Sequence, residues 1–170
     1  MRRALVFLGA LLVLSASGCA EGRAEPVGAT RLTASQTWEG AHAERFSTRT
    51  KSGGVEGEIL WPARVRGGPP PLVVLVASSN GQGTTALALR LAGSGVATLR
   101  YPDHGALDAD DVAASVTALR LDPRVGRIVL VAAAEHAEAL GAAPADARIL
   151  VPRGATSSDV VAALSKHVSP

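Results

Sequence analysis

Residues 72–77 read Leu-Val-Val-Leu-Val-Ala, and the expected architecture of the chain depends on them. The run has no polar break, which is typical of a strand buried on both faces of a sheet. Residues 96–101 and 127–132 have a similar character, and residues 148–151 are expected to form a fourth, shorter strand. Several buried strands in one chain indicate a sheet that is covered on both sides.

Helical patterns separate these strands. Residues 84–92, 108–121 and 135–140 are predicted helices, and Thr156 or Ser157 is expected to cap a final one. Strands that alternate with helices predict right-handed crossovers and a mostly parallel sheet with helices on both faces. The strand at residues 148–151 is expected to lie at an edge of that sheet, where it could pair with another chain.

The residues that precede the first buried strand predict an antiparallel hairpin. Residues 46–50 and 55–61 alternate in polarity and flank a turn at residues 51–54. Pro62 ends the second strand, because proline has no N–H to donate to a ladder. We therefore expect an α/β fold led by an antiparallel hairpin, in one domain spanning residues 43–170.

The composition excludes several classes of protein. Of the 170 residues, 47% are hydrophobic and one is cysteine. This content is too apolar for a disordered chain and rules out a disulfide framework and zinc sites built on several cysteines. The length fits one compact domain.

The chain begins like an exported protein. Arg2 and Arg3 precede an apolar run at residues 4–16, which is too short to span a bilayer and has the form of a secretory signal. The following Ser-Gly-Cys resembles the bacterial lipoprotein lipobox, which implies lipid attachment at Cys19. We expect a signal peptide at residues 1–18.

Residues 19–42 are expected to be a flexible tether, because they are small, polar and interrupted by glycine and proline. Cleavage after Gly18 removes Arg2 and Arg3 from the 17 basic residues, so the remaining 15 balance the 15 acidic residues. A neutral chain with 3% aromatic residues is not expected to bind nucleic acid. Ala20 follows the cysteine, which by resemblance to sorted lipoproteins implies the outer membrane, facing the periplasm.

Several short motifs resemble an α/β-hydrolase of the dienelactone-hydrolase and acyl-peptidase type. The segments at residues 57–62 (GEILWP) and 72–81 (LVVLVASSNG) look like the entry to that fold. Residues 95–105 (GVATLRYPDHG) are similar to the family's GxAxLRYDDRG, and residues 119–125 (LRLDPRV) to its LRxDPRV. The resemblance runs from about Gly57 to Ala139 and implies a reduced α/β-hydrolase-like fold.

The resemblance also implies that the nucleophile is absent. Where the family has VGHSEGG, residues 131–137 read VAAAEHA, so Ala134 stands at the serine position and the glycines of the turn are replaced. A methyl group cannot attack a carbonyl, and loss of a serine nucleophile costs about a million-fold in rate in the best-studied case. The residues after Leu140 are expected to form one strand and one helix, with no loop that carries the family's acid and histidine. The expected domain is shortened and non-catalytic.

Two alternatives stay open. Ser78 or Ser79 with Asp103 and His104 are the residue types of a triad, which would make the protein a weak esterase or peptidase. The second alternative rests on residues 81–86 (GQGTTA).

This segment satisfies GxGxxG/A, so Gly81 and Gly83, followed by Asp103, are candidates for a dinucleotide site. Glu135 and His136 alone are too few ligands for a metal. The favoured hypothesis involves no cofactor and no metal. The favoured hypothesis is a lipid-anchored binding or structural module whose partner is an envelope protein or a small ligand.

Overall fold

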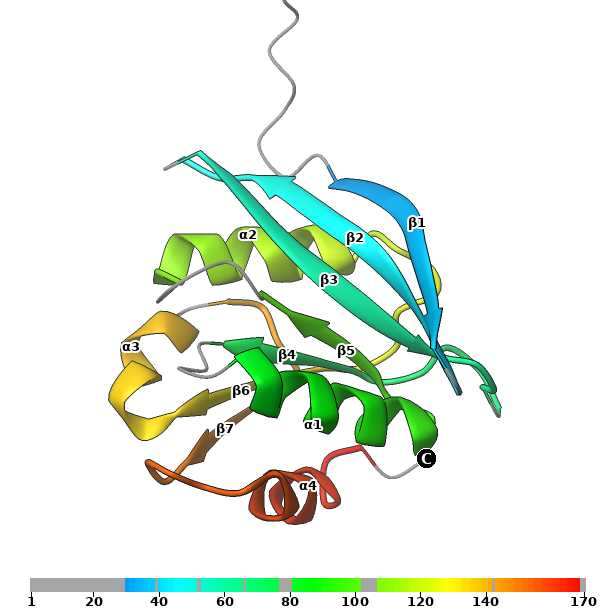
Figure 1. Ribbon diagram of the computed structural model, residues 1–170. Helices are drawn as coiled ribbons and strands as arrows, with labels where there is room; N and C mark the ends of the chain where they lie inside the picture. Colours follow the sequence, from blue (N-terminus) through cyan, green and yellow to red (C-terminus); the bar gives the residue numbers. More distant parts are fainter. Residues whose placement is uncertain are drawn as a thin grey trace, which may run out of the picture.

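The computed structural model describes residues 30–38, 40–51, 53–65, 67–76, 81–101, 107–141 and 143–168. Its centre is a seven-stranded sheet in the order β1-β2-β3-β5-β4-β6-β7 (Figure 1). The strands are β1 (Thr30–Trp38), β2 (Ala41–Arg49), β3 (Gly54–Pro62), β4 (Leu72–Val76), β5 (Ala97–Arg100), β6 (Ile128–Ala133) and β7 (Ala147–Val151). The helices are α1 (Gly81–Gly93), α2 (Ala109–Leu119), α3 (Ala137–Leu140) and α4 (Ser157–Leu164), with a short 3-10 turn, η1 (Ala134–His136), before α3.

The sheet has an antiparallel half and a parallel half. β1, β2 and β3 form an antiparallel meander, and β3 joins the other half through an antiparallel pairing with β5. The remaining pairs, β5 with β4, β4 with β6 and β6 with β7, are parallel. The expected α/β fold with a leading antiparallel hairpin is therefore confirmed, with each strand of the parallel half within about a residue of its predicted bounds.

Helices cover both faces of the parallel half (Figure 1). On one face, α2 and α3 pack over β4, β5 and β6 through a core that includes Val116, Leu119 and Leu130. On the other face, α1 and α4 pack over β4, β6 and β7 in a core that includes Leu91 and Leu164. All five residues of β4 are buried, as the uninterrupted apolar run predicts.

The two best-defined helix starts follow from their capping residues. The Asp108 side chain accepts a hydrogen bond from the Asp111 N–H at 2.8 Å and begins α2. Thr156, one of the two residues expected to cap the final helix, forms a capping box with Asp159 at the start of α4. These bonds satisfy backbone donors that have no partner within the helix.

The boundary between tether and domain requires a correction. Residues 30–38 form β1 and Ala41 begins β2, so the sheet starts at Thr30 and not at residue 43. Leu32 pairs with Phe46 in the resulting ladder. Gly40 turns the chain between the two strands with a φ of +82°, a conformation that glycine adopts readily. The predicted signal peptide, Cys19 and the predicted tether up to residue 29 lie outside the described residues; within the described part, no helix is long and apolar enough to cross a membrane.

Candidate functional site

The carboxyl ends of the parallel strands lie at the same end of the sheet. Open α/β sheets bind ligands in the crevice at this end. β4 ends at Val76, β5 at Arg100, β6 at Ala133 and β7 at Val151. Ser78, Ser79, Asp103 and His104 belong to the segments after β4 and β5, and they lie outside the described residues. The described part of this end of the sheet is built mainly from the end of β6 and the start of α2.

Ala134 is the first residue after β6 and opens η1. Its carbonyl accepts the Ala137 N–H, so the chain turns directly from strand into helix. Ala134 and Glu135 are exposed, and His136 is half-buried. The side chain that Ala134 presents at this junction is a methyl group, which can neither lose a proton nor act as a nucleophile.

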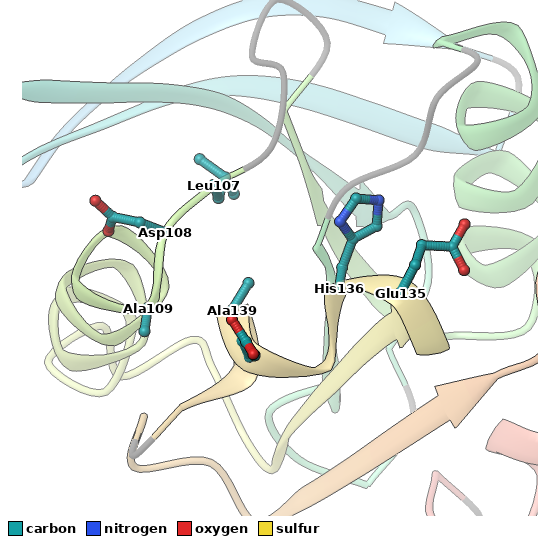
Figure 2. A pocket seen from close by; sticks show the side chains of 7 residues that line it. Leu107, Asp108, Ala109, Glu135, His136 and Ala139 are labelled. Carbon is teal, nitrogen blue, oxygen red and sulfur yellow. The ribbon is translucent and has the colours of Figure 1, made fainter.

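A cavity of about 330 Å³ lies beside this junction (Figure 2). The start of α2 forms one wall, and η1 and α3 form the other. Its lining residues are Leu107, Asp108, Ala109, Glu135, His136, Glu138 and Ala139. The Asp108 carboxylate is already engaged in capping α2. The cavity therefore combines small apolar side chains with carboxylates and one imidazole.

Glu135 and His136 do not make a metal site in the described part of the chain. No group of three or more His, Cys, Asp or Glu side chains comes together there. Glu135 lies 3.9 Å from Arg153, in an exposed ion pair between η1 and the end of β7. The expectation that the protein holds no metal stays a prediction.

The glycine motif lies inside a helix. Gly81 is the first residue of α1 and Gly83 is in its first turn. In a dinucleotide site, the first glycine makes the tight turn between the strand and the helix. Here four residues separate the end of β4 from the first glycine. The motif is thus displaced into α1, and Asp103, its expected ribose partner, is outside the described residues.

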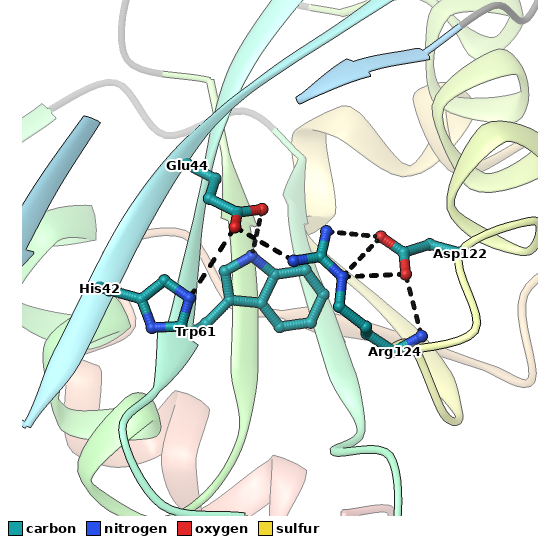
Figure 3. A network of polar contacts seen from close by, with 5 residues as sticks. All are labelled: His42, Glu44, Trp61, Asp122 and Arg124. Carbon is teal, nitrogen blue, oxygen red and sulfur yellow. Dashed lines mark hydrogen bonds and ion pairs between the residues drawn. The ribbon is translucent and has the colours of Figure 1, made fainter. Parts of the chain in front are cut away.

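A polar network lies at the other end of the strands, where the turn between α2 and β6 leads into β6 (Figure 3). Trp61 Nε1 donates to Glu44 Oε2 at 3.0 Å, and Arg124 Nη1 donates to Glu44 Oε1 at 3.1 Å. Arg124 Nη2 also donates to Asp122 Oδ2 at 2.8 Å, and its guanidinium carbon lies 4.5 Å from the centre of the Trp61 ring. His42 Nε2 approaches Glu44 Oε1 at 3.9 Å. The network joins the antiparallel meander to the turn between α2 and β6.

The contact between Arg124 and Asp122 shifts the pKa values of both side chains. Its hydrogen bonds hold the pKa of the Asp122 carboxyl below its usual range, against a smaller opposing effect of burial. The pKa of Arg124 is raised by Asp122 and then by Glu44. The sequence did not predict this network, although Asp122 and Arg124 lie within the LRLDPRV motif, because Glu44 and Trp61 are distant in sequence.

A second charged contact links the two halves near α1. Arg100 of β5 binds Glu58 of β3 through two nitrogens, and Arg100 Nη1 donates to Thr85 Oγ1 at 2.6 Å. The Arg100 and Glu58 side chains are only 11% and 18% exposed. This contact holds the start of α1 against the junction of the antiparallel and parallel strands.

Two comparisons by sequence give no relative: no protein-family model matches the chain, and no curated protein matches it. Comparison of the structures finds proteins with a similar fold. A cold-adapted esterase from an Arctic intertidal metagenomic library aligns with a TM-score of 0.53 and 14% identity, over 68% of this chain and 62% of that one.

Two other solved structures are similar. A putative acetyl xylan esterase from Bacteroides fragilis aligns with a TM-score of 0.50 and 12% identity, over 68% of this chain and 44% of that one. A dienelactone hydrolase-like promiscuous phosphotriesterase from metagenomic libraries gives 0.50 and 19%, over 66% of this chain and 59% of that one. At these identities the similarity concerns the fold, and the chain covers less than two thirds of each structure. The fold is therefore α/β-hydrolase-like and similar to that of these esterases.

Proposed function

We propose that this chain is a lipid-anchored envelope protein whose α/β-hydrolase-like domain binds a ligand or partner and does not catalyse hydrolysis. The main support for the proposal is the alanine at position 134. It occupies the junction between β6 and the following helical turn, and its methyl group offers no nucleophile. A shared fold does not imply a shared activity, because function depends on the residues at the site.

The backbone at this junction gives a second argument. In α/β-hydrolases the nucleophile sits on a sharp, strained turn between strand and helix, which exposes its oxygen. Ala134 instead belongs to a 3-10 helix, and the preceding Ala133 is extended with φ −67° and ψ 152°. Both are ordinary conformations for alanine. A serine introduced here would therefore lack the geometry that makes the family's serine reactive.

The test of the non-catalytic role uses the full chain with a fluorophosphonate probe and a p-nitrophenyl ester. We expect neither labelling nor turnover, and we expect Ala134→Ser to gain neither. Labelling of the wild-type chain that disappears in Ser78→Ala or Ser79→Ala would contradict the proposal and establish the weak hydrolase instead. His104→Ala would then be expected to abolish turnover as well.

Lipid attachment at Cys19 supplies the proposed location. Each buried lipid CH₂ contributes about 0.8 kcal/mol, so several acyl chains would hold the protein firmly to a membrane. We expect labelled palmitate to be incorporated in a bacterial host and to be lost in Cys19→Ser. Recovery of unlabelled wild-type protein in the soluble fraction would refute the anchor.

The cavity beside Ala134 is the proposed binding site. Filling it should reduce binding without changing the fold, so Ala139→Leu is the test variant and Ala162→Leu, on the exposed side of α4, is its control. We expect the wild-type chain and the control to enrich the same envelope component in a pulldown, and Ala139→Leu to lose it. Failure of the wild-type chain to enrich any component would contradict a binding role. A thermal shift with NAD(P) that Gly83→Val abolishes would favour the dinucleotide alternative.

A further inference from the structure

β7 leaves one edge of the sheet open. In the described part of the chain it pairs with β6 and with no other strand (Figure 1). Leu150, in the second half of this strand, is a large apolar side chain that is 51% exposed. An edge strand presents a row of unpaired backbone donors and acceptors, which is a template for another strand.

The backbone groups that face this edge can be identified. The Leu72 N–H donates to the Arg127 carbonyl at 2.8 Å, and backbone groups alternate sides along a strand, so the even-numbered residues of β6 face β7. In the register that pairs Val129 with Ala147 and Val131 with Ile149, these residues bond to the backbone groups of Ala147, Ile149 and Val151. The N–H and C=O groups of Arg148 and Leu150 therefore point away from β6, toward the open edge.

The chain's own first residues are poor occupants of this edge. Residues 20–29 (AEGRAEPVGA) contain two glycines and a proline, which disfavour a strand. The chain also enters the sheet at Thr30 in β1, the strand at the opposite edge. That opposite edge is less suited to pairing, because β1 has a register shift between Ala34 and Gln36, and such bulges protect edges. The ladder between β6 and β7 has no shift.

We propose that β7 pairs with β7 of a second copy of this chain, antiparallel and about a two-fold axis at Ile149. In this register Arg148 faces Leu150 of the second copy in both directions, and Ile149 faces Ile149. Arg148 and Leu150 have their backbone groups directed outward, so each of these two pairs can exchange two hydrogen bonds. The arrangement is self-complementary, as a two-fold interface must be.

The side chains of β7 suit this register. Ala147, Ile149 and Val151 belong to the core under α1 and α4, so pairing extends one apolar layer across both copies. On the other face, Leu150 would lie beside Arg148 of the second copy. The Arg148 guanidinium donates to the Ala143 carbonyl of its own chain, which directs its charge away and leaves its alkyl stem to cover Leu150.

The interface would be small, because a single five-residue strand forms its centre. Interfaces below about 1,200 Å² are typical of weak, transient pairs. We therefore expect self-association only at high protein concentration, and the test must detect a minor dimer.

Cysteine cross-linking tests the register. In the proposed pairing, residues 148 and 150 of different copies are directly opposite, with Cα atoms about 5.5 Å apart, within the range of a disulfide. Each variant carries Cys19→Ser. We expect Arg148→Cys or Leu150→Cys alone to cross-link slowly, and an equimolar mixture of the two to form a disulfide dimer about tenfold faster or more. Leu121→Cys, at a 79% exposed position away from β7, measures the rate of random collision.

A mixture that cross-links no faster than Leu121→Cys would overturn the proposal, and so would fast dimerisation of Leu150→Cys alone, which requires another register. Sedimentation provides a measurement that needs no cysteine. The wild-type mass should rise toward a dimer as the concentration approaches about 1 mM, whereas Leu150→Lys should remain a monomer and Leu121→Lys should behave as wild type. A wild-type chain that stays monomeric throughout would refute the pairing.

Discussion

Arg124→Met is the substitution that best tests how the two halves of the sheet are held together. Arg124 contacts both carboxylates of the network and lies over the Trp61 ring (Figure 3). Methionine keeps much of the apolar stem over the ring and removes only the charge and its hydrogen bonds. The effect on stability therefore measures the electrostatic part of the contact.

The expected cost can be worked from the contacts. The Arg124 side chain is 45% exposed, so each of its ion pairs is screened and contributes about 0.2–1 kcal/mol. The contact with the ring contributes about 0.5–1 kcal/mol at an exposed site. Glu44 and Asp122 are only 16% and 13% exposed, so losing their partner adds a desolvation cost. We expect a loss of about 2 kcal/mol, or about 6 °C in Tm.

The pH dependence gives this prediction a second test. The folded-state pKa of Asp122 lies below its unfolded value, so the stability it contributes is present at neutral pH and is lost as the pH falls through the folded pKa. The cost of Arg124→Met should therefore be full at pH 7 and smaller at about pH 3. Urea unfolding followed by tryptophan fluorescence at both pH values measures the difference.

The control for this series is Arg153→Met. Arg153 is 90% exposed and its ion pair with Glu135 spans 3.9 Å, so its removal should change the free energy of unfolding by less than about 0.5 kcal/mol. If Arg124→Met also changes it by less than 0.5 kcal/mol, the network is not what joins the two halves, and the reasoning is wrong.

Three further predictions concern packing, a buried hydroxyl and a helix cap. A Cβ at Gly126 would lie 2.7 Å from the Pro69 carbonyl oxygen, so Gly126→Ala should cost about 1–3 kcal/mol in thermal unfolding, whereas Gly93→Ala, with nothing within 4 Å, should not destabilise. Thr98 is fully buried and its hydroxyl has no hydrogen-bond partner in the described part of the chain, so Thr98→Val should be neutral or stabilising; a clear loss in urea unfolding would reveal a missed partner. Thr156→Ala removes the cap of α4 and should cost about 1 kcal/mol, with faster hydrogen exchange confined to that helix.

The parallel half was predictable because its signals are local. In β4 and β6, apolar residues follow one another because both faces are covered, and the capping residues Asp108 and Thr156 mark helix starts in the sequence itself. Such patterns need no knowledge of the rest of the fold.

β1 was missed because its stability comes from a distant partner. In Thr30–Trp38, only Leu32 and Trp38 are large apolar residues, so no apolar stripe is visible. The available signal was the content of threonine, a β-branched residue, together with Gly40 as the turn before β2. The strand is fixed by its ladder with β2, which composition alone does not reveal.

The candidate site was predictable in one respect. The motif alignment predicted a strand-to-helix junction near Ala134, and β6 ends at Ala133 immediately before η1. The cavity was not predictable, because its other wall comes from the start of α2, which the chain reaches more than 20 residues earlier. Side chains from separate elements meet only once the helices have packed on the sheet.

The hydrolase-like sheet and the proposed loss of hydrolase chemistry are compatible because they depend on different residues. The sheet is held by β4, β5 and β6, whose buried side chains pack against helices on both faces. None of that packing requires a serine or a strained turn after β6, where Ala134 is exposed. Backbone strain at such a turn costs about 1–3 kcal/mol, which catalysis justifies and binding does not. A chain that only binds is therefore expected to retain the sheet and to relax this turn into an ordinary helical one.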